Sequence, residues 1–210
     1  MHMCLRNSVM DIAHKNVPLS RQCTMTTLVL LLMCMAISAC ADVETPTTPR
    51  GVDEATVTAL HKSAEQGNAT AQNRLGLLYN QGQGVPQNPL LATQWFEKAV
   101  EQGDAGAQVN LGTLYLLGQG ALESDQMALF WFRRAADQQE TLAFAKLGFM
   151  YEHGRGVTQD FIQAHMWYTL SAARGEKRAL ASRDQLAKQM TPAQVAAAQQ
   201  LAREWKPKPK

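Results

Sequence analysis

Histidines, cysteines and glycine-rich turns are the residues of this 210-residue chain that could support catalysis or ligand binding. Three histidines lie beyond residue 40, at His61, His153 and His165, and their spacing is not that of metal ligands. The sequence contains no G-x-S-x-G, H-E-x-x-H, S-x-x-K or G-x-x-x-x-G-K pattern, and no nucleophile with an adjacent base can be named. The sequence therefore predicts a protein that is not an enzyme and that uses no metal and no cofactor.

Cys40 carries the most specific chemical prediction. An apolar run over residues 28–39 follows a basic stretch and is too short to span a bilayer, as is typical of the hydrophobic core of a secretory signal. The run ends Ile37-Ser38-Ala39-Cys40, which resembles a bacterial lipobox. The resemblance implies cleavage before Cys40 and attachment of a diacylglyceryl group to its sulfur. The alternative is an ordinary cysteine at a soluble-secretory cleavage site.

The N-terminal region is accordingly interpreted as a targeting segment. Residues 1–39 are expected to form a lipoprotein signal peptide, and residues 40–52 the lipidated cysteine and a flexible tether. The residue after the cysteine is Ala41 and not the aspartate that would retain a lipoprotein in the inner membrane. The resemblance therefore implies export to the periplasmic face of the outer membrane in a Gram-negative host. The remaining cysteines, Cys4, Cys23 and Cys34, lie in the signal region, so no disulfide framework is expected.

The charge balance gives no support for a nucleic-acid partner. The net charge is +2 and falls to zero after Cys40, once three basic residues and one acidic residue are removed from the totals of 20 and 18. From Ser171 onward nine basic residues stand against three acidic ones. This C-terminal excess is either a solvated face or a contact with anionic lipid or polymer.

Glycine, tyrosine and tryptophan recur at a spacing of 36 residues, which is the strongest pattern in the chain. The recurring sets are Gly76, Gly112 and Gly148; Tyr79, Tyr115 and Tyr151; and Trp95, Trp131 and Trp167. A fixed period of this size indicates stacked structural repeats, which generally bind rather than catalyse.

Each period is predicted to contain two helices joined by a glycine corner. The first helix is expected to begin after Asn68, Asp104 or Glu140 and to end at the glycine pair that opens with Gly82, Gly118 or Gly154. The second helix is expected to begin after Asn88, Ser124 or Asp160, which share one column of the repeat.

The glycines inside the first helices require a packing explanation. A glycine within a helix costs about 1 kcal/mol relative to alanine, so its recurrence at Gly76, Gly112 and Gly148 predicts close contact with the second helix. The contact is expected near the small column Ala92, Ala128 and Ala164. The tyrosine and tryptophan columns are interpreted as core rather than as a ligand cage.

The repeats resemble the Sel1-like repeat family. The resemblance is carried by AQNRLGLLYNQGQGVPQNPLLATQWFEKAVEQG, AQVNLGTLYLLGQG with ALFWFRRAA, and AFAKLGFMYEHGRGVTQDFIQAHMWYTLSAA. It implies an all-α fold, an α/α solenoid in which tetratricopeptide-like helix pairs form a right-handed superhelix. The third repeat departs from the pattern because Gln139 stands where the others have Gly67 and Gly103.

The ends of the array are expected to carry helical caps, because terminal repeats would otherwise expose apolar faces. The period is expected to fail beyond Gly175, although helical patterning continues to about Trp205. The predicted segments are an N-terminal capping helix at 53–66, repeats at 67–102, 103–138 and 139–175, C-terminal capping helices at 176–205 and a disordered tail at 206–210.

The resemblance also implies a binding face, because the first helices of tetratricopeptide-like pairs line the concave side of the superhelix. The first-helix positions outside the shared columns are predicted to bind a partner: Thr70, Asn73, Leu77, Asn80, Val109, Thr113, Leu116, Leu142, Phe149 and Glu152. The alternative is that the C-terminal helix folds back and covers part of this face.

The function predicted from these features is a non-enzymatic adaptor or scaffold of the bacterial cell envelope. It would be anchored through the lipid on Cys40 and would bind a polypeptide of another envelope protein. Two alternatives remain at this point. One is an enzyme-like protein that binds or hydrolyses peptidoglycan or β-lactams, and the other is a secreted effector that engages host proteins.

Overall fold

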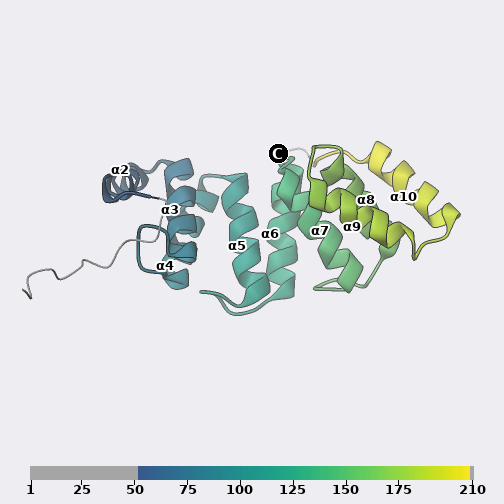
Figure 1. Ribbon diagram of the computed structural model, residues 1–210, viewed down its shortest axis with the longest axis horizontal. Coiled ribbons are helices and arrows are strands. Elements are labelled where there is room, and N and C mark those ends of the chain that lie inside the picture. The colour runs from purple at the N-terminus through teal and green to yellow at the C-terminus, as the bar shows by residue number, and fades with distance from the viewer. Residues whose placement is uncertain (1–51, 209–210) are drawn as a thin grey trace, which may run out of the picture. The chain divides into compact units, whose positions relative to one another are not determined.

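A computed structural model describes residues 52–208, which form nine helices and no strand (Figure 1). The predicted signal peptide, Cys40 and nearly all of the tether lie outside the described residues, as do residues 209–210. Within the described range no helix combines the length and the apolar character needed to cross a membrane. The helices are α2 (Glu54–Glu65), α3 (Ala69–Gln81), α4 (Pro89–Glu101), α5 (Ala105–Leu117), α6 (Asp125–Asp137), α7 (Thr141–His153), α8 (Phe161–Ala172), α9 (Lys177–Ala187) and α10 (Pro192–Glu204).

The helices begin at the capping residues that the sequence predicts. Asn68, Asp104 and Glu140 each accept a hydrogen bond from a first-turn amide of α3, α5 or α7. The side chains of Asn88, Ser124 and Asp160 likewise accept hydrogen bonds from first-turn amides of α4, α6 and α8. The first helices end at glycines in the left-handed conformation, with φ of 68° at Gly82 and 66° at Gly154.

Gln139 preserves the turn between the second and third repeats despite the missing glycine. Its φ is 64°, in the same left-handed region that Gly67 and Gly103 adopt at φ of 89° and 85°. The Gln139 amide donates to the carbonyl of Ala136. The geometry of the repeat is therefore kept at some conformational cost, because non-glycine residues disfavour this region.

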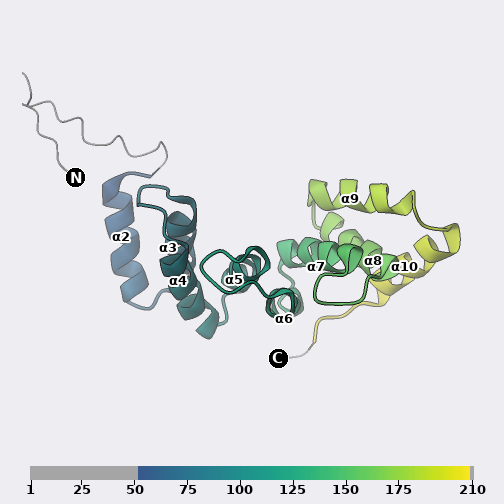
Figure 2. The same ribbon diagram turned by 90° about the horizontal axis from the view of Figure 1, so that it is seen from below.

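The helices stack in order along the chain, as Figure 2 shows. Each first helix packs on its own second helix, in the pairs α3–α4, α5–α6 and α7–α8, and neighbouring pairs join through α4–α5 and α6–α7. Three buried rings, Phe96, Phe132 and Tyr168, lie between the paired helices. The predicted all-α helical repeat solenoid is confirmed.

The glycines inside the first helices face these rings. A Cβ added at Gly76, Gly112 or Gly148 would lie 2.6, 2.7 or 2.5 Å from a ring carbon of Phe96, Phe132 or Tyr168. The predicted close approach to the second helix is confirmed, and at Gly112 the carbonyl oxygen of Ala128, in the predicted alanine column, lies 3.3 Å from the added Cβ. The nearest atoms at all three glycines belong to the rings, which were not predicted. The ring follows the repeated tryptophan by one residue and fills the space that a side chain on the glycine would need.

Helix α2 occupies the place of a second helix at the N-terminal end. The backbone at Val52, just before α2, approaches Gly84 in the way that the start of α4 approaches Gly120 and the start of α6 approaches Gly156. Its N-cap Asp53 accepts from the Thr56 amide at 3.0 Å. This placement explains why a single helix can cover α3 without a first-helix partner.

The repeat period extends further than the sequence indicates. Glu176 caps α9 in the column of Glu140, and buried Ala179 follows in the column of Ala143. The expectation that the period fails beyond Gly175 is therefore wrong for the first turn of α9. The column is lost later in the helix, where Arg183 and Asp184 stand in place of the leucine and glycine of the repeat.

Helix α10 closes the C-terminal end of the array. It begins at a capping box between Thr191 and Gln194 and, like α9, packs on α8 (Figure 2). Trp205 follows the helix and meets the rings of Phe144 and Trp167 edge-on, at 5.2 and 5.7 Å between centroids. Residues 206–208 of the predicted tail form no helix.

Candidate partner-binding groove

A groove of about 710 Å³ runs across the first helices of the repeats and is hereafter called the first-helix groove. Its walls come from α3, α5, α7 and α9, and buried Tyr168 of α8 also lines it. These helices follow one another along the array because the second helices α4, α6 and α8 pack between them. The groove is thus a product of the stacking rather than of any one repeat.

Seven of the ten predicted binding residues line this groove. They are Leu77, Asn80, Val109, Thr113, Leu116, Leu142 and Phe149. The other three lie outside it. Thr70 is exposed, Asn73 donates to Asp104 and accepts from Asn110, and Glu152 accepts a hydrogen bond from the Tyr168 hydroxyl at 2.7 Å.

Two of the lining residues belong mainly to the core. Val109 is 4% and Leu116 is 7% exposed, and both pack in the cluster that includes Phe132 and Phe144. They form the floor of the groove and are not free to be exchanged without loss of stability. The sequence could not show this, because their columns vary between repeats as surface positions do.

The apolar surface that a partner could reach is supplied by other residues. Leu117 is 56% exposed and Leu142 is 50% exposed, and both line the groove. Phe149, next to them, stacks on His153 with 4.3 Å between ring centroids. Exposed leucines on a groove wall cost solvation free energy that an apolar partner would recover.

Sequence reasoning missed Leu117, Lys146 and the four α9 residues of the groove: Glu176, Arg178, Ala179 and Ser182. The signal for α9 was present, because Glu176 and Ala179 continue the 36-residue register. No comparable signal existed for Lys146, whose neighbours are fixed only by the stacking.

The charged groups of the groove are unequally paired. Glu176 caps its own helix by accepting from the Arg178 amide. Burial raises the pKa of the Tyr168 hydroxyl, and its hydrogen bond to Glu152 adds to the effect. Burial also lowers the pKa of the half-buried Lys146 ammonium, which forms no hydrogen bond or ion pair with any described residue.

The C-terminal helix does not cover the groove, so the alternative of a folded-back helix is wrong. No residue of α10 lines the groove; α10 packs on α8, and its Leu201 and Ala202 join the core around Trp167. It is α9 that extends the groove.

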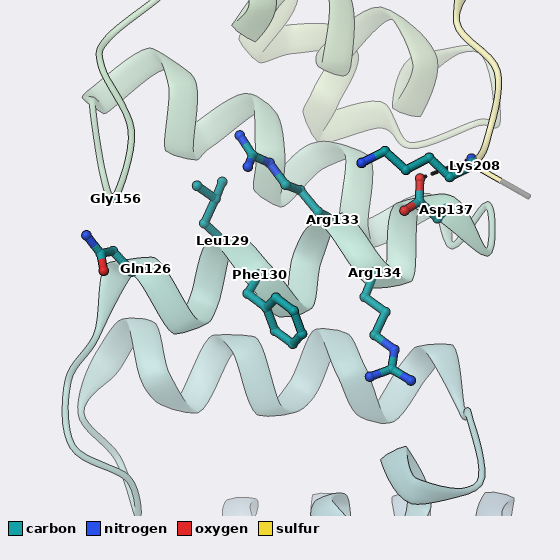
Figure 3. Close-up of a pocket in the computed structure, with 8 residues that line it drawn as sticks. All are labelled: Gln126, Leu129, Phe130, Arg133, Arg134, Asp137, Gly156 and Lys208. Atoms are coloured by element: carbon teal, nitrogen blue, oxygen red, sulfur yellow. Dashed lines mark hydrogen bonds between the residues drawn. The ribbon is translucent and has the colours of Figure 1, made fainter. Parts of the chain in front are cut away.

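A second cleft of about 450 Å³ lies along α6 and is shown in Figure 3. Its charged residues are already engaged within the chain. Arg133 donates to the Tyr151 hydroxyl at 2.8 Å, and the Lys208 amide donates to Asp137 at 3.3 Å, as the dashed line in Figure 3 marks. Arg134 lies over the ring of Trp131. This cleft is smaller than the first-helix groove.

No cluster of three or more potential metal ligands occurs among residues 52–208. Two of the histidines have partners in their own helices: His61 lies 3.2 Å from Glu65, and His153 bonds the Phe149 carbonyl. His165 is buried under α9, and burial lowers its pKa.

Known families and solved structures identify the fold more closely. Residues 69–104, 105–140 and 143–176 match the Sel1 repeat. A protective antigen present in uropathogenic Escherichia coli strains, which displays an SLR fold, is 33% identical, with a TM-score of 0.66 over 71% of this chain. The match covers 32% of that antigen, so this chain spans about a third of its length.

A Sel1 repeat protein from Oxalobacter formigenes is 38% identical, with a TM-score of 0.54 over 60% of this chain and 51% of that one. No curated protein sequence matches the chain. Sel1 repeat proteins are generally protein-interaction scaffolds, and their fold is typically non-enzymatic. Because three matched repeats account for half of its length, the chain belongs to the Sel1 repeat family.

Proposed function

We propose that this protein is a lipid-anchored adaptor of the bacterial cell envelope that binds a polypeptide segment of another envelope protein in the first-helix groove. The observation that carries the proposal is the groove itself, with half-exposed Leu117 and Leu142 on its walls. Neither leucine belongs to a core cluster of the described residues, and a partner segment would remove both from water.

The proposed anchor rests on the sequence of the N-terminal region. The Ile37-Ser38-Ala39-Cys40 motif after an apolar run supports cleavage and lipidation at Cys40. A lipid on Cys40 followed by the short segment 41–51 would keep the groove close to the membrane surface. Partners within the envelope are therefore favoured over released ones.

Partner binding is tested by crosslinking and pull-down from the native envelope with a C-terminally tagged chain. The groove variant is Leu117→Ser with Leu142→Ser. The matched control is Leu90→Ser with Leu122→Ser, which removes two leucines that are 68% and 90% exposed and do not line the groove. A protein partner should be recovered with the wild type and the control and be lost with the groove variant.

Equal recovery from all three forms would move the binding site away from the groove. Recovery of glycan without protein would instead favour the peptidoglycan-binding function. Because each pair of substitutions replaces exposed leucines, thermal unfolding of both variants should stay close to that of the wild type.

Anchoring is tested separately by inhibition of lipoprotein signal peptidase with globomycin and by Cys40→Ala. Globomycin should leave a precursor that keeps residues 1–39, and Cys40→Ala should leave a precursor that incorporates no fatty acid. Processed protein that is free in the medium despite an intact Cys40 would contradict the anchor and favour a secreted effector.

A further inference from the structure

Lys146 occupies an unusual position on α7, half-buried in the first-helix groove among apolar side chains. Ala145 and Phe149 flank it in the lining of the groove, and Leu142 lies one turn earlier. A half-buried ammonium without a carboxylate or a hydrogen-bond acceptor loses part of its solvation. The Lys146 nitrogen is still open to water, so a ligand that enters the groove can reach it.

The equivalent position in the preceding repeat shows what satisfies a polar side chain here. Asn110 lies 36 residues before Lys146 and donates to Asn73 of α3 at 2.8 Å. One repeat later the corresponding pair is Lys146 and Val109, and valine offers no acceptor. The polar bridge between first helices is thus lost at the step where the groove gains a cation.

The acidic residues around the groove do not compensate for this cation. Glu176 accepts the Arg178 amide at 3.0 Å as a helix cap, and Glu152 accepts the Tyr168 hydroxyl. Arg178 adds a second positive charge to the lining. The groove lining therefore holds exposed leucines beside two cationic side chains, Lys146 and Arg178, and one carboxylate, Glu176, that caps a helix.

We infer that the segment bound in the first-helix groove is an apolar peptide that carries an aspartate or glutamate side chain, and that this carboxylate pairs with Lys146. The inference rests on the proposed function and adds the chemistry of the partner. Lys146 would act as a specificity-determining residue, since a peptide with an amide in place of the carboxylate would cover the ammonium and leave it unpaired. The leucines would supply the remaining contact area.

The probe is an array of short apolar peptides, each present in matched forms with Glu, Gln or Lys at the central position. It is incubated with the full chain, purified from the envelope in detergent. Peptides bound in the groove are those whose signal falls with the Leu117→Ser, Leu142→Ser variant. Among these, the Glu form should bind about tenfold more tightly than its Gln form, because a desolvated charge pair is lost in the latter.

Lys146→Met tests the assigned residue, because methionine keeps the apolar stem and removes the charge. It should abolish the preference for Glu over Gln, whereas Lys62→Met, at an exposed position of α2, should retain it. In a second variant, Lys146→Glu, the preference should pass to the Lys peptides.

Equal binding of the Glu and Gln forms, or a Glu preference that persists in Lys146→Met, would overturn the inference and leave the groove as a binding site. If no peptide signal depends on Leu117 and Leu142, the inference fails together with groove binding. The three results are distinct, so failure of the charge pairing cannot be mistaken for failure of the adaptor function.

Discussion

The first two repeats and the third repeat use different side chains at the same joint. In the first two, a glutamine after the second helix donates to a glutamine on the first helix: Gln102 to Gln72 at 2.7 Å, and Gln138 to Gln108 at 3.0 Å. In the third repeat these two columns hold Arg174 and Phe144. The Arg174 guanidinium lies 4.5 Å from the centre of the Phe144 ring.

This difference decides where the array ends. A glutamine pair joins the two helices of its repeat through one hydrogen bond and leaves the next repeat to stack on it. The fully buried Phe144 ring instead offers an aromatic surface, against which Trp205 and Trp167 pack. Phenylalanine at position 144, where the other repeats have Gln72 and Gln108, thus provides the surface on which Trp205 packs. The comparison suggests that solenoid caps can be specified by a single joint position.

The most damaging change should be Phe144→Gln, which gives the third repeat the side chain of the other two. Phe144 is fully buried, so its loss should lower the free energy of unfolding by about 3 kcal/mol. The contact with Trp205 is lost as well, and hydrogen exchange should accelerate in 192–204 before the rest of the chain. Urea unfolding and exchange measure the two effects.

Gln108→Leu, at the equivalent position of the second repeat, is the matched control for that comparison. Gln108 is also fully buried, but its amide nitrogen has no hydrogen-bond partner among the described residues. Removing it should change the free energy of unfolding by no more than about 1 kcal/mol, since an unsatisfied group is removed together with one hydrogen bond. A loss as large as that of Phe144→Gln would show that the two joints are energetically alike.

Gly148→Ala and Gly76→Ala compare ring packing in the third and first repeats. The new methyl group would collide with Tyr168 or Phe96, at 2.5 or 2.6 Å. The Tyr168 ring is held by its hydrogen bond to Glu152, whereas Phe96 has no such bond and can shift. We expect a loss of about 2 kcal/mol at Gly148 and a smaller one at Gly76, after the gain in helix propensity. Equal thermal shifts would contradict this difference.

The third repeat should also carry a pH dependence that the others lack. His165 is 2% exposed, in the column of Thr93 and Leu129, and burial, assisted by Arg183, lowers its pKa below the ordinary 6.5. The unfolded chain therefore binds a proton that the folded chain disfavours. The contribution of neutral His165 to the free energy of unfolding should be fully present above pH 6.5 and should decrease as the pH falls below that value.

The variant His165→Leu, which copies Leu129, isolates this contribution. Denaturant unfolding of the variant should lose the slope just below pH 6.5 that the wild type shows, while the slope from carboxylates at lower pH should remain. A slope that is identical in both proteins would exclude His165 as its source.

The smallest effect is expected at Arg155, which joins the second and third repeats. Its Nε donates to Asp125 at 2.6 Å and its Nη2 to Glu123 at 3.1 Å. Arg155→Gln copies Gln83 and Gln119 of the other repeats and removes two ion pairs, with half-buried Asp125 and with exposed Glu123. The loss should be about 0.5 kcal/mol and should shrink in high salt. A salt-independent loss would indicate packing rather than charge.

The sequence was sufficient for most of the fold and for part of the groove. Helix starts could be predicted at Asn68 and Asn88 because a cap is a local interaction within one turn. The groove was less predictable. Leu116 and Leu142 are both variable leucines on first helices, yet one is buried and the other is half-exposed. That distinction depends on what the neighbouring repeat covers, which no local pattern contains.

The sequence by itself determined the period, the capped helix pairs and the glycines at which paired helices approach each other. The period follows from comparing the repeats, and the caps and glycines depend on interactions within one repeat. The motif at Cys40 likewise carries its prediction without any fold. Only the tertiary structure showed that Trp205, which follows α10, packs on Phe144 of the third repeat. Likewise, only the structure showed that Lys146 lines the groove without the inter-repeat hydrogen bond that Asn110 makes to Asn73. The physical reason is that burial and pairing between repeats are set by stacking, which joins residues about 30 to 37 positions apart.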